Sequence, residues 1–287
     1  MMKIENFDSP IGALVTGVDL SDDLDPDSFE TLQDAWNERS VLVYRDQTLS
    51  PAELVNFSGR FGEHEIHVLN QYLHPDQPEI LVVSNVKKDG EHIGVYDAGR
   101  YWHTDLSYLA KPSRGSVLYA IEIPEENGKP LGDTIWASTA AAFEGLNPGL
   151  QERLDGRTAM FDFAKRYRKL VADGDQNAVL TDEQKAKTPP VEHPVVRTHP
   201  VTGRKCLNVN EGHTVNINGM DDDESLSLLE DLWAHIVKPD FTYRHKWRPG
   251  DVVMWDNVPT QHLAICDYAL PQRRLLHRTT LTGTRPY

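Results

Sequence analysis

The sequence contains little cysteine and no long apolar run. Its two cysteines, Cys206 and Cys266, are too few for a disulfide framework and are typical of a reducing compartment. No apolar run approaches the roughly 18 residues that a membrane-spanning helix needs, and the first residues lack the apolar segment of a secretory signal. We therefore expect a cytoplasmic protein without a membrane span.

Basic residues are also in short supply. The chain has 29 Lys and Arg against 44 Asp and Glu, which gives a formal net charge of −15 at pH 7. A surface of this charge repels nucleic acids and anionic lipids, so we expect no nucleic-acid partner. A small anionic ligand would need a local cationic pocket. Twelve histidines in such an acidic chain are a first indication of metal chemistry.

The residue pattern predicts one α+β domain, mainly β, that spans residues 1–287. The 19 Gly and 18 Pro are spread along the whole chain, as in a loop-rich β architecture. Residues 164–190 are polar, charged and poor in β-forming residues, which predicts a surface insertion or a mobile lid. Short strands are predicted at 14–20, 41–45, 80–83, 116–123, 195–198, 206–209, 242–247, 252–255 and 275–281.

Helices are predicted between these strands. Asp25-Pro26-Asp27 and Ser50-Pro51 each have the sequence of a helix start. A further helix is predicted over 138–150, closed by Asn147-Pro148-Gly149. The clearest amphipathic helix is predicted over 221–237, with its apolar side formed by Leu226, Leu229, Leu232, Trp233 and Ile236.

Three residues are candidate metal ligands: His103, Asp105 and His262. If His103-Thr104-Asp105 forms a strand, the imidazole and the carboxylate share a face and Thr104 points away. Two histidines and one carboxylate bind iron in non-haem Fe(II) oxygenases and leave open coordination positions. The His-x-acid pattern is not specific alone, because His74-Pro75-Asp76 repeats it. Pro75 disrupts strand geometry and predicts a turn there.

Two arginines near the end of the chain share a predicted strand face. Arg274 and Arg278 alternate with Leu276, so all three side chains would point the same way. Buried arginines need anionic partners. The pattern leaves two alternatives open, which are an anionic ligand and surface ion pairs with the excess acid of the protein itself.

With these motifs in order, the sequence resembles the Fe(II)- and 2-oxoglutarate-dependent dioxygenases that include taurine dioxygenase and 2,4-dichlorophenoxyacetate dioxygenase. The resemblance covers nearly the whole chain, and its motifs occur at matching spacing. They include Ile11-Gly12-Ala13, Trp102-His103-Thr104-Asp105, Gly132-Asp133-Thr134, Val209-Asn210-Glu211-Gly212, Trp255-Asp256-Asn257, Thr260-Gln261-His262, Pro271-Gln272-Arg273-Arg274 and His277-Arg278-Thr279-Thr280.

The resemblance implies a fold, a reaction and a set of cofactors. The fold would be a double-stranded β-helix, which is a cupin-like jelly roll with flanking helices. The reaction would hydroxylate a C–H bond of a small anionic substrate with Fe(II), 2-oxoglutarate and O₂, giving succinate and CO₂. His103, Asp105 and His262 match the iron ligands of the family. Thr134 and Arg274 match the pair that holds the far carboxylate of 2-oxoglutarate.

The resemblance also suggests substrate contacts. Arg278 matches the arginine that grips the sulfonate in the taurine branch, and His67 and Phe163 match further pocket positions there. Leu106 follows the metal dyad in a segment expected to form a pocket wall. Asn70 is a departure, because it stands where the taurine enzyme has a substrate-contacting tyrosine.

Other departures leave the substrate open. Residues 94–101 lack the asparagine that the taurine enzyme places near the substrate amine, and residues 72–103 are closer to an isonitrile-forming branch. We therefore expect a taurine-like sulfonate or a carboxylate. The alternatives are an N-substituted amino acid, an aryloxyalkanoate that is cleaved, and a non-catalytic jelly-roll binding protein. The resemblance to this family implies a homodimer or a homotetramer.

Overall fold

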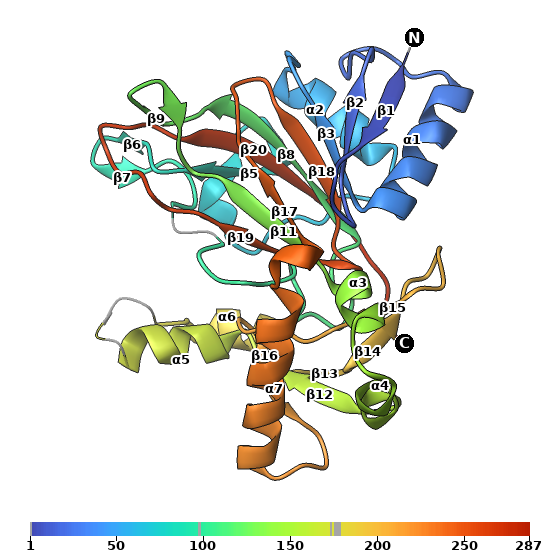
Figure 1. Cartoon of the computed structure of the whole chain (residues 1–287). Coiled ribbons are helices and arrows are strands. Elements are labelled where there is room, and N and C mark those ends of the chain that lie inside the picture. Colours follow the sequence, from blue (N-terminus) through green and yellow to red (C-terminus); the bar gives the residue numbers. More distant parts are fainter. Residues whose placement is uncertain (1, 97–98, 173, 175–178) are drawn as a thin grey trace.

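A large mixed sheet forms the centre of the computed structural model, which describes residues 2–96, 99–172, 174 and 179–287 (Figure 1). Neighbouring strands pair antiparallel except β2 and β3, which run parallel. In spatial order the eight strands are β1 (Lys3–Asn6), β2 (Ala13–Thr16), β3 (Val41–Tyr44), β18 (Val252–Asp256), β8 (Gly115–Glu122), β20 (Leu275–Leu281), β5 (Gln77–Ser84) and β4 (Leu73–His74).

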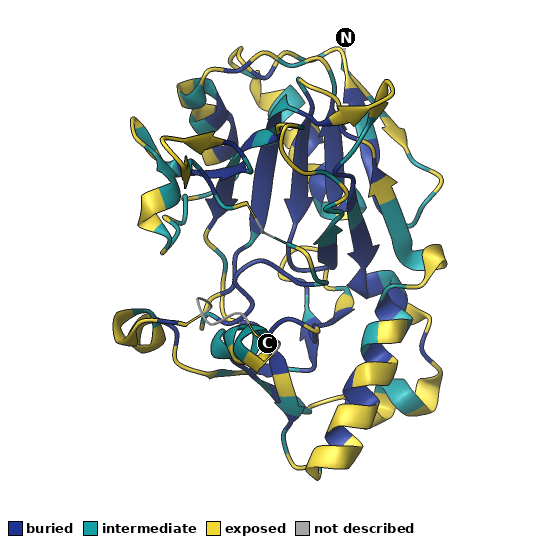
Figure 2. Cartoon of the chain, turned by 90° about the vertical axis from the view of Figure 1, so that its left-hand side faces the viewer, coloured by how far each residue is buried: buried dark blue, intermediate teal, exposed yellow. Residues whose placement is uncertain are grey.

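A second sheet of three strands lies against the large one. Its spatial order is β17 (Thr242–His245), β11 (Thr134–Ser138) and β19 (Thr260–Ala264). Trp136 of β11 packs in one cluster with Val41, Val43 and Trp255 of the large sheet. Leu42 and Tyr44 alternate with these valines and pack on the opposite face of the large sheet, as the two-residue period of a strand requires. The large sheet is therefore buried on both faces there (Figure 2).

The remaining strands form four small sheets. One contains β13 (Val191–Pro194), β12 (Thr158–Phe161) and β16 (Thr214–Ile217). The predicted hairpin near residue 200 is confirmed, because β14 pairs antiparallel with β15. The other short strands are paired in hairpins. The bounds are β14 (Val196–Thr198), β15 (Lys205–Leu207), β6 (Lys87–Lys88), β7 (Glu91–His92), β9 (Glu125–Glu126) and β10 (Lys129–Pro130).

The first two helices begin where the sequence predicts. In α1 (Pro26–Arg39), Asp25 caps the N-terminus by accepting from the Ser28 backbone N–H. In α2 (Pro51–Gly59), Ser50 and Glu53 form a reciprocal capping box. Both helices pack on the outer face of the large sheet through buried side chains, which are Leu32, Trp36, Leu54 and Phe57.

The long helix near the C-terminus is also confirmed, with one error in its apolar face. α7 (Asp222–Ile236) begins at the Asp221 cap and buries Leu229, Leu232 and Ile236. Leu226 was expected on the buried side but is 49% exposed. Ser225, Leu228 and Leu229 around it are buried, so the packed face of the helix is turned away from Leu226, which lines a surface pocket with Glu230 and Trp233.

The single helix predicted over 138–150 is wrong. The chain forms two helices, α3 (Thr139–Glu144) and α4 (Pro148–Leu154). Asn147 does not end the first helix but caps the second by accepting from the Leu150 backbone N–H. The physical reason is that Asn-Pro favours the start of a helix, because proline at the first helical position has no N–H to leave unpaired.

The described part of the segment 164–190 contains two helices. They are α5 (Ala164–Ala172) and α6 (Asp182–Lys187), while residues 173 and 175–178 lie outside the described residues. Figure 1 shows α5, α6, α7 and the β12–β13–β16 sheet together at one end of the molecule. The short helices η1 (Asn70–Tyr72) and η2 (Pro239–Phe241) complete the fold. In the described part of the chain, no helix has the length and apolarity to cross a membrane.

Candidate metal centre and adjoining pockets

The two candidate histidine ligands are paired through their backbones. His103 and His262 form an isolated antiparallel bridge, in which each backbone N–H donates to the other residue's carbonyl, at 3.2 and 2.8 Å. β19 thereby positions His262 opposite His103, with ring centroids 4.2 Å apart. The strand predicted over residues 103–105 is wrong beyond His103. The backbone turns after it, and Leu106 has a positive φ of 54°.

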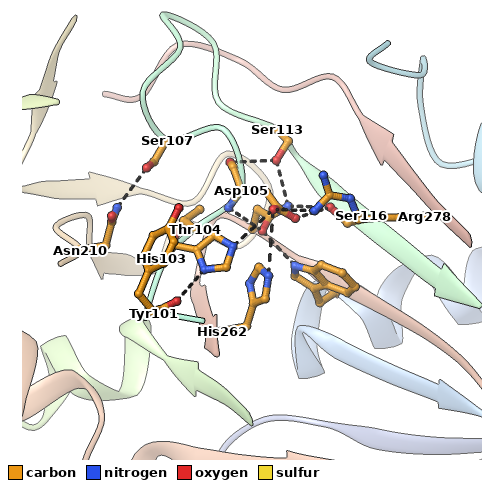
Figure 3. A network of polar contacts seen from close by, with 12 residues as sticks. Tyr101, His103, Thr104, Asp105, Ser107, Ser113, Ser116, Asn210, His262 and Arg278 are labelled. Carbon is orange, nitrogen blue, oxygen red and sulfur yellow. Dashed lines mark hydrogen bonds and ion pairs between the residues drawn. The ribbon is translucent and has the colours of Figure 1, made fainter. Parts of the chain in front are cut away.

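The side chains of His103, Asp105 and His262 nevertheless converge (Figure 3). Their ligand atoms all lie within 4.8 Å of one another, and all three residues are buried. Asp105 Oδ1 is 3.7 Å from His103 Nε2 and 4.0 Å from His262 Nε2. His103 Nδ1 donates to the Tyr101 carbonyl at 2.8 Å, which leaves the lone pair on Nε2 facing the centre. This donor set fits a divalent metal ion.

The charge states also suit a metal ion. Burial alone would raise the pKa of Asp105, but the Arg278 guanidinium and the two histidines outweigh it and hold the pKa well below its usual range. Burial and the neighbouring His103 lower the pKa of His262 to about 3, so its ring is neutral. A carboxylate anion and neutral imidazoles are the forms that bind a metal.

A hydrogen-bond network holds the Asp105 carboxylate in place. Ser116 Oγ donates to Asp105 Oδ2 at 2.7 Å, and Ser113 Oγ donates to the Asp105 carbonyl at 3.0 Å. Asn257 Nδ2 donates to both serine hydroxyls, at 2.9 and 3.2 Å. Trp255 Nε1 fixes that amide by donating to Asn257 Oδ1 at 2.9 Å. Sequence reasoning did not select either serine, because nothing in their local pattern marks them.

A small cavity of about 40 Å³ leads from the histidines to Thr134 and Arg274. Thr134 Oγ1 accepts from Trp247 Nε1 at 3.0 Å, so its own hydroxyl hydrogen remains to donate. Arg274 is 4% exposed, and its Nη2 donates to the Gly132 carbonyl at 3.3 Å. Among the described residues that line the cavity, none is acidic. A buried guanidinium in these surroundings fits a carboxylate ligand.

Arg278 lines this cavity and a larger neighbouring pocket. Arg274 and Arg278 do face the same cavity, as their spacing predicts, although the ladder between β20 and β8 shifts register at Leu275 and Leu276. Arg278 Nη1 lies 3.1 Å from Asp105 Oδ1, which makes it an internal ion pair. Its Nε atom is buried without a hydrogen-bond partner among the described residues.

The larger pocket has a volume of about 390 Å³ and lies beside the metal-ligand candidates. His67, Leu106 and Phe163 line it together with Arg278. Asn70 is exposed on η1 and is not among the lining residues. The lining is rich in aromatic rings, which come from Tyr72, Tyr96, Tyr101, Tyr108, Phe163 and Tyr167.

The segment 164–190 contributes directly to this pocket. Arg166, Tyr167 and Leu170 of α5 line it, as do Val179 and Gln184 further along the segment. The segment therefore covers the pocket, whereas closure as a lid stays a prediction. Within the 94–101 stretch that departs from the taurine enzyme, Asp97 and Ala98 lie outside the described residues.

Sequence reasoning missed a buried histidine in the pocket wall. His213 lies directly after the Asn210-Glu211-Gly212 motif and is 2% exposed. Its ring is in edge contact with Tyr108, with centroids 4.8 Å apart. Burial lowers the pKa of His213 to about 3. The adjacent motif was the available signal, since it continues into this position.

With this geometry in view, comparison with known proteins identifies the family. A family model described as "Taurine catabolism dioxygenase TauD, TfdA family" matches residues 3–280. The chain belongs to this family. It is a 2-oxoglutarate-dependent dioxygenase and therefore an oxidoreductase that uses 2-oxoglutarate and a metal ion.

Individual relatives cover almost the whole chain. Pentalenolactone F synthase of Streptomyces arenae is 34% identical over 88% of this chain and 86% of that protein. The α-ketoglutarate-dependent sulfate ester dioxygenase of Pseudomonas putida is 34% identical over 96% of this chain and 88% of that protein. A solved taurine dioxygenase structure from Burkholderia xenovorans superposes with a TM-score of 0.82 at 32% identity, covering 99% of this chain and 90% of that chain.

Proposed function

We propose that the protein hydroxylates a C–H bond of a small organic anion, with 2-oxoglutarate and O₂ consumed and succinate and CO₂ released. The observation that carries this proposal is the convergence of His103, Asp105 and His262 beside a cavity that reaches a buried arginine. Two histidines and a carboxylate are a donor set that would hold Fe(II) and leave room for a keto acid and O₂.

The residues of the chain would hold and orient the reactants. His103 Nε2, Asp105 Oδ1 and His262 Nε2 would bind Fe(II). Arg274 and the Thr134 hydroxyl would hold the far carboxylate of 2-oxoglutarate and so direct its keto acid end toward the metal-ligand candidates. The burial of both residues keeps water from competing for these contacts.

Arg278 would hold the anionic group of the substrate. Its Nη1 faces Asp105, while its Nε is buried without a partner among the described residues and remains available to an anion. Asp105 is the only acidic residue among the described lining of the larger pocket, which also contains Arg166. Two guanidinium groups line this pocket in a chain of net charge −15, which favours an anionic substrate. His67, Leu106 and Phe163 would form the walls around it.

Succinate release tests the proposal. The purified protein with Fe(II), 2-oxoglutarate and O₂ is screened with sulfonates, alkyl sulfates, aryloxyalkanoates and N-substituted amino acids. His103→Ala or Asp105→Ala should abolish substrate-dependent succinate formation. The matched control is His74→Ala, from the other His-x-Asp sequence, which lies on β4 away from the pocket lining. Unchanged turnover in the His103 and Asp105 variants would refute the assignment.

A second candidate substrate class is an aryloxyalkanoate, which hydroxylation beside the ether oxygen would cleave. The aromatic side chains around the larger pocket favour it, since they can stack on a substrate ring. A higher kcat/KM for aryloxyalkanoates than for alkyl sulfonates of similar length would select this candidate.

We further propose that the two facing sheets form a double-stranded β-helix, or jelly roll, within a single domain of residues 1–287. The tryptophan-rich cluster shared by the two sheets supports this proposal. A homodimer or homotetramer and a cytoplasmic location stay predictions. Light scattering on the purified chain tests the oligomeric state, and cell fractionation tests the location.

A further inference from the structure

We propose that His213 is a specificity-determining residue, which donates a hydrogen bond from Nε2 to an oxygen acceptor on the substrate. The site would then select organic anions that carry a second acceptor, such as a ketone, ester or ether oxygen, apart from the anionic group. This inference rests on the proposed function, because it assumes that the larger pocket holds the substrate.

A chain of hydrogen bonds fixes the tautomer of His213. Asn210 Oδ1 accepts from the His213 backbone N–H at 2.9 Å, so the Asn210 amide group must point the other way. There Asn210 Nδ2 donates to Ser107 Oγ at 3.0 Å. Ser107 Oγ also lies 2.9 Å from His213 Nδ1, and both residues are buried.

The direction of the last bond follows from the hydroxyl hydrogen of Ser107. Among the described residues, His213 Nδ1 is the acceptor within hydrogen-bond distance of that hydroxyl. A buried hydroxyl that donates to Nδ1 requires an unprotonated Nδ1, so the proton of the neutral ring is on Nε2. The network behind His213 therefore makes Nε2 a hydrogen-bond donor.

The Nε2 side of the ring faces the pocket. Tyr101, which lines the same pocket, places its hydroxyl oxygen 3.5 Å from Nε2, at the outer limit of a hydrogen bond. The ring also contacts Tyr108 and Phe163, which line the same pocket. The donor thus meets an aromatic wall and one distant oxygen, and an apolar substrate body would leave it poorly satisfied.

Arg278 and His213 line one pocket and recognise different groups. The guanidinium of Arg278 suits a carboxylate or sulfonate, whereas the single N–H of His213 suits a neutral oxygen. A pocket that contains a buried donor discriminates against an analogue that lacks the acceptor, because the donor then loses its partner. We expect a preference of roughly tenfold or more for the acceptor-bearing anion.

The tautomer can be measured directly. Full-length protein labelled with ¹⁵N-histidine, with Zn(II) in place of iron, should show His213 among the histidines that have a pyridine-type Nδ1 and a pyrrole-type Nε2, such as His199. The signal should disappear in His213→Phe, and Ser107→Ala should restore a mixture of tautomers. A His213 signal with the proton on Nδ1 would overturn the inference.

The selectivity is measured by calorimetry on the enzyme with Fe(II) and 2-oxoglutarate under anaerobic conditions. The probes are nonanoate and a series of oxononanoates with the ketone at successive carbons. At one ketone position the wild type should bind at least about tenfold more tightly than to nonanoate. His213→Phe should remove this preference, and His213→Gln, which keeps an N–H donor, should retain part of it.

The outcomes separate the inference from the proposed function. No preference at any ketone position, or a preference that survives in His213→Phe, would overturn the role of His213. Succinate release in the substrate screen, and its loss in His103→Ala, report on the dioxygenase site independently of this result. Thermal unfolding of both His213 variants checks that the fold is intact.

Discussion

At the scale of single residues, the two carboxylate oxygens of Asp105 have different partners. Oδ1 faces the two imidazoles and Arg278, while Oδ2 accepts from Ser116. Because Ser116 occupies one oxygen, the other is directed toward the metal-ligand candidates. Ser116 therefore orients the carboxylate without itself being a candidate ligand.

Replacing Ser116 with Ala should weaken metal binding about 10- to 100-fold, the usual effect of removing a partner that orients a metal ligand. A titration of the metal-free protein with Fe(II) or Co(II) measures this directly. Ser58→Ala is the control, because Ser58 is equally buried but bonds within α2 and to His64. Equal metal affinity in Ser116→Ala and Ser58→Ala would contradict this role.

Gly212 is the position where a single methyl group should disturb the metal centre. A Cβ atom there would lie 2.1 Å from the ring of Tyr101. Tyr101 accepts from His103 Nδ1 through its carbonyl and packs on the His103 ring at 4.9 Å. The absence of a side chain at Gly212 therefore lets Tyr101 support a candidate metal ligand.

Gly212→Ala should destabilise the fold by about 1–3 kcal/mol through overpacking and should also lower metal affinity. Urea unfolding and the metal titration measure the two effects. Gly149→Ala is the matched control, since its Cβ would make only an ordinary contact at 3.5 Å with Asn147. Wild-type stability in Gly212→Ala would mean that Tyr101 can move at no cost.

At the scale of elements, the turn between β18 and β19 connects the two sheets and places His262. Asp256, at the end of β18, is fully buried and accepts from His199 Nε2 at 2.8 Å and from the Val258 backbone N–H at 2.8 Å. It also forms an ion pair with Arg114. Burial alone would raise the pKa of Asp256, but Arg114 and His199 outweigh it and lower the pKa.

Asp256→Asn should destabilise the protein by about 3–5 kcal/mol, because it leaves Arg114 without its anionic partner in a largely buried position. The free energy of unfolding in urea gives the measurement. Asp240→Asn, at an exposed position in η2, should stay within about 0.5 kcal/mol of wild type. A similar small change for Asp256→Asn would show that the buried pair contributes little.

The sequence predicts elements well where a local signal decides the structure. Asp25, Ser50 and Asp221 cap helices in the predicted places, because capping depends on the few residues around the cap. The prediction that Asn147 ends a helix was wrong because the same Asn-Pro-Gly sequence fits both the end of one helix and the start of the next. Leu226 was misplaced because helical periodicity predicts an apolar side but not which edge of that side the packing partner covers.

In the candidate site, too, some features could be predicted from local motifs and others depend on tertiary packing. The convergence of His103, Asp105 and His262 could be expected from the motifs of the family. The turn after His103 could not, since His103 pairs with His262, which lies far away in the sequence. Ser116 is brought to the site by tertiary packing, and no local pattern identifies it, whereas His213 directly follows the Asn210-Glu211-Gly212 motif.

At the scale of the whole molecule, the site lies between the two sheets. The large sheet contributes Arg278 from β20 and Ser116 from β8, and the three-stranded sheet contributes His262 from β19 and Thr134 from β11. Burial between sheets gives the candidate ligands a dry environment. Partial or full burial also lowers the pKa of several histidines of the molecule, which makes stability depend on pH.

Three histidines with lowered pKa values should make the protein lose stability in mild acid. Burial lowers the pKa of His67 and His277 to about 4 and that of His213 to about 3. The unfolded chain takes up protons on these residues from about pH 6.5, whereas the folded chain does so only near the lowered values. The unfolded state therefore binds more protons in this window, and the folded state loses stability as the pH falls from 6.5 toward 4.

Each such histidine contributes a slope of about 1.4 kcal/mol per pH unit within its window. His213→Phe should therefore make the dependence of unfolding free energy on pH shallower by about this amount between pH 6 and pH 4.5. Urea unfolding at successive pH values measures the slope, and His277→Phe should reduce it in the same direction. If the unfolding free energy of both variants depends on pH as steeply as that of the wild type, these two rings have the same pKa in the folded protein and in the unfolded chain.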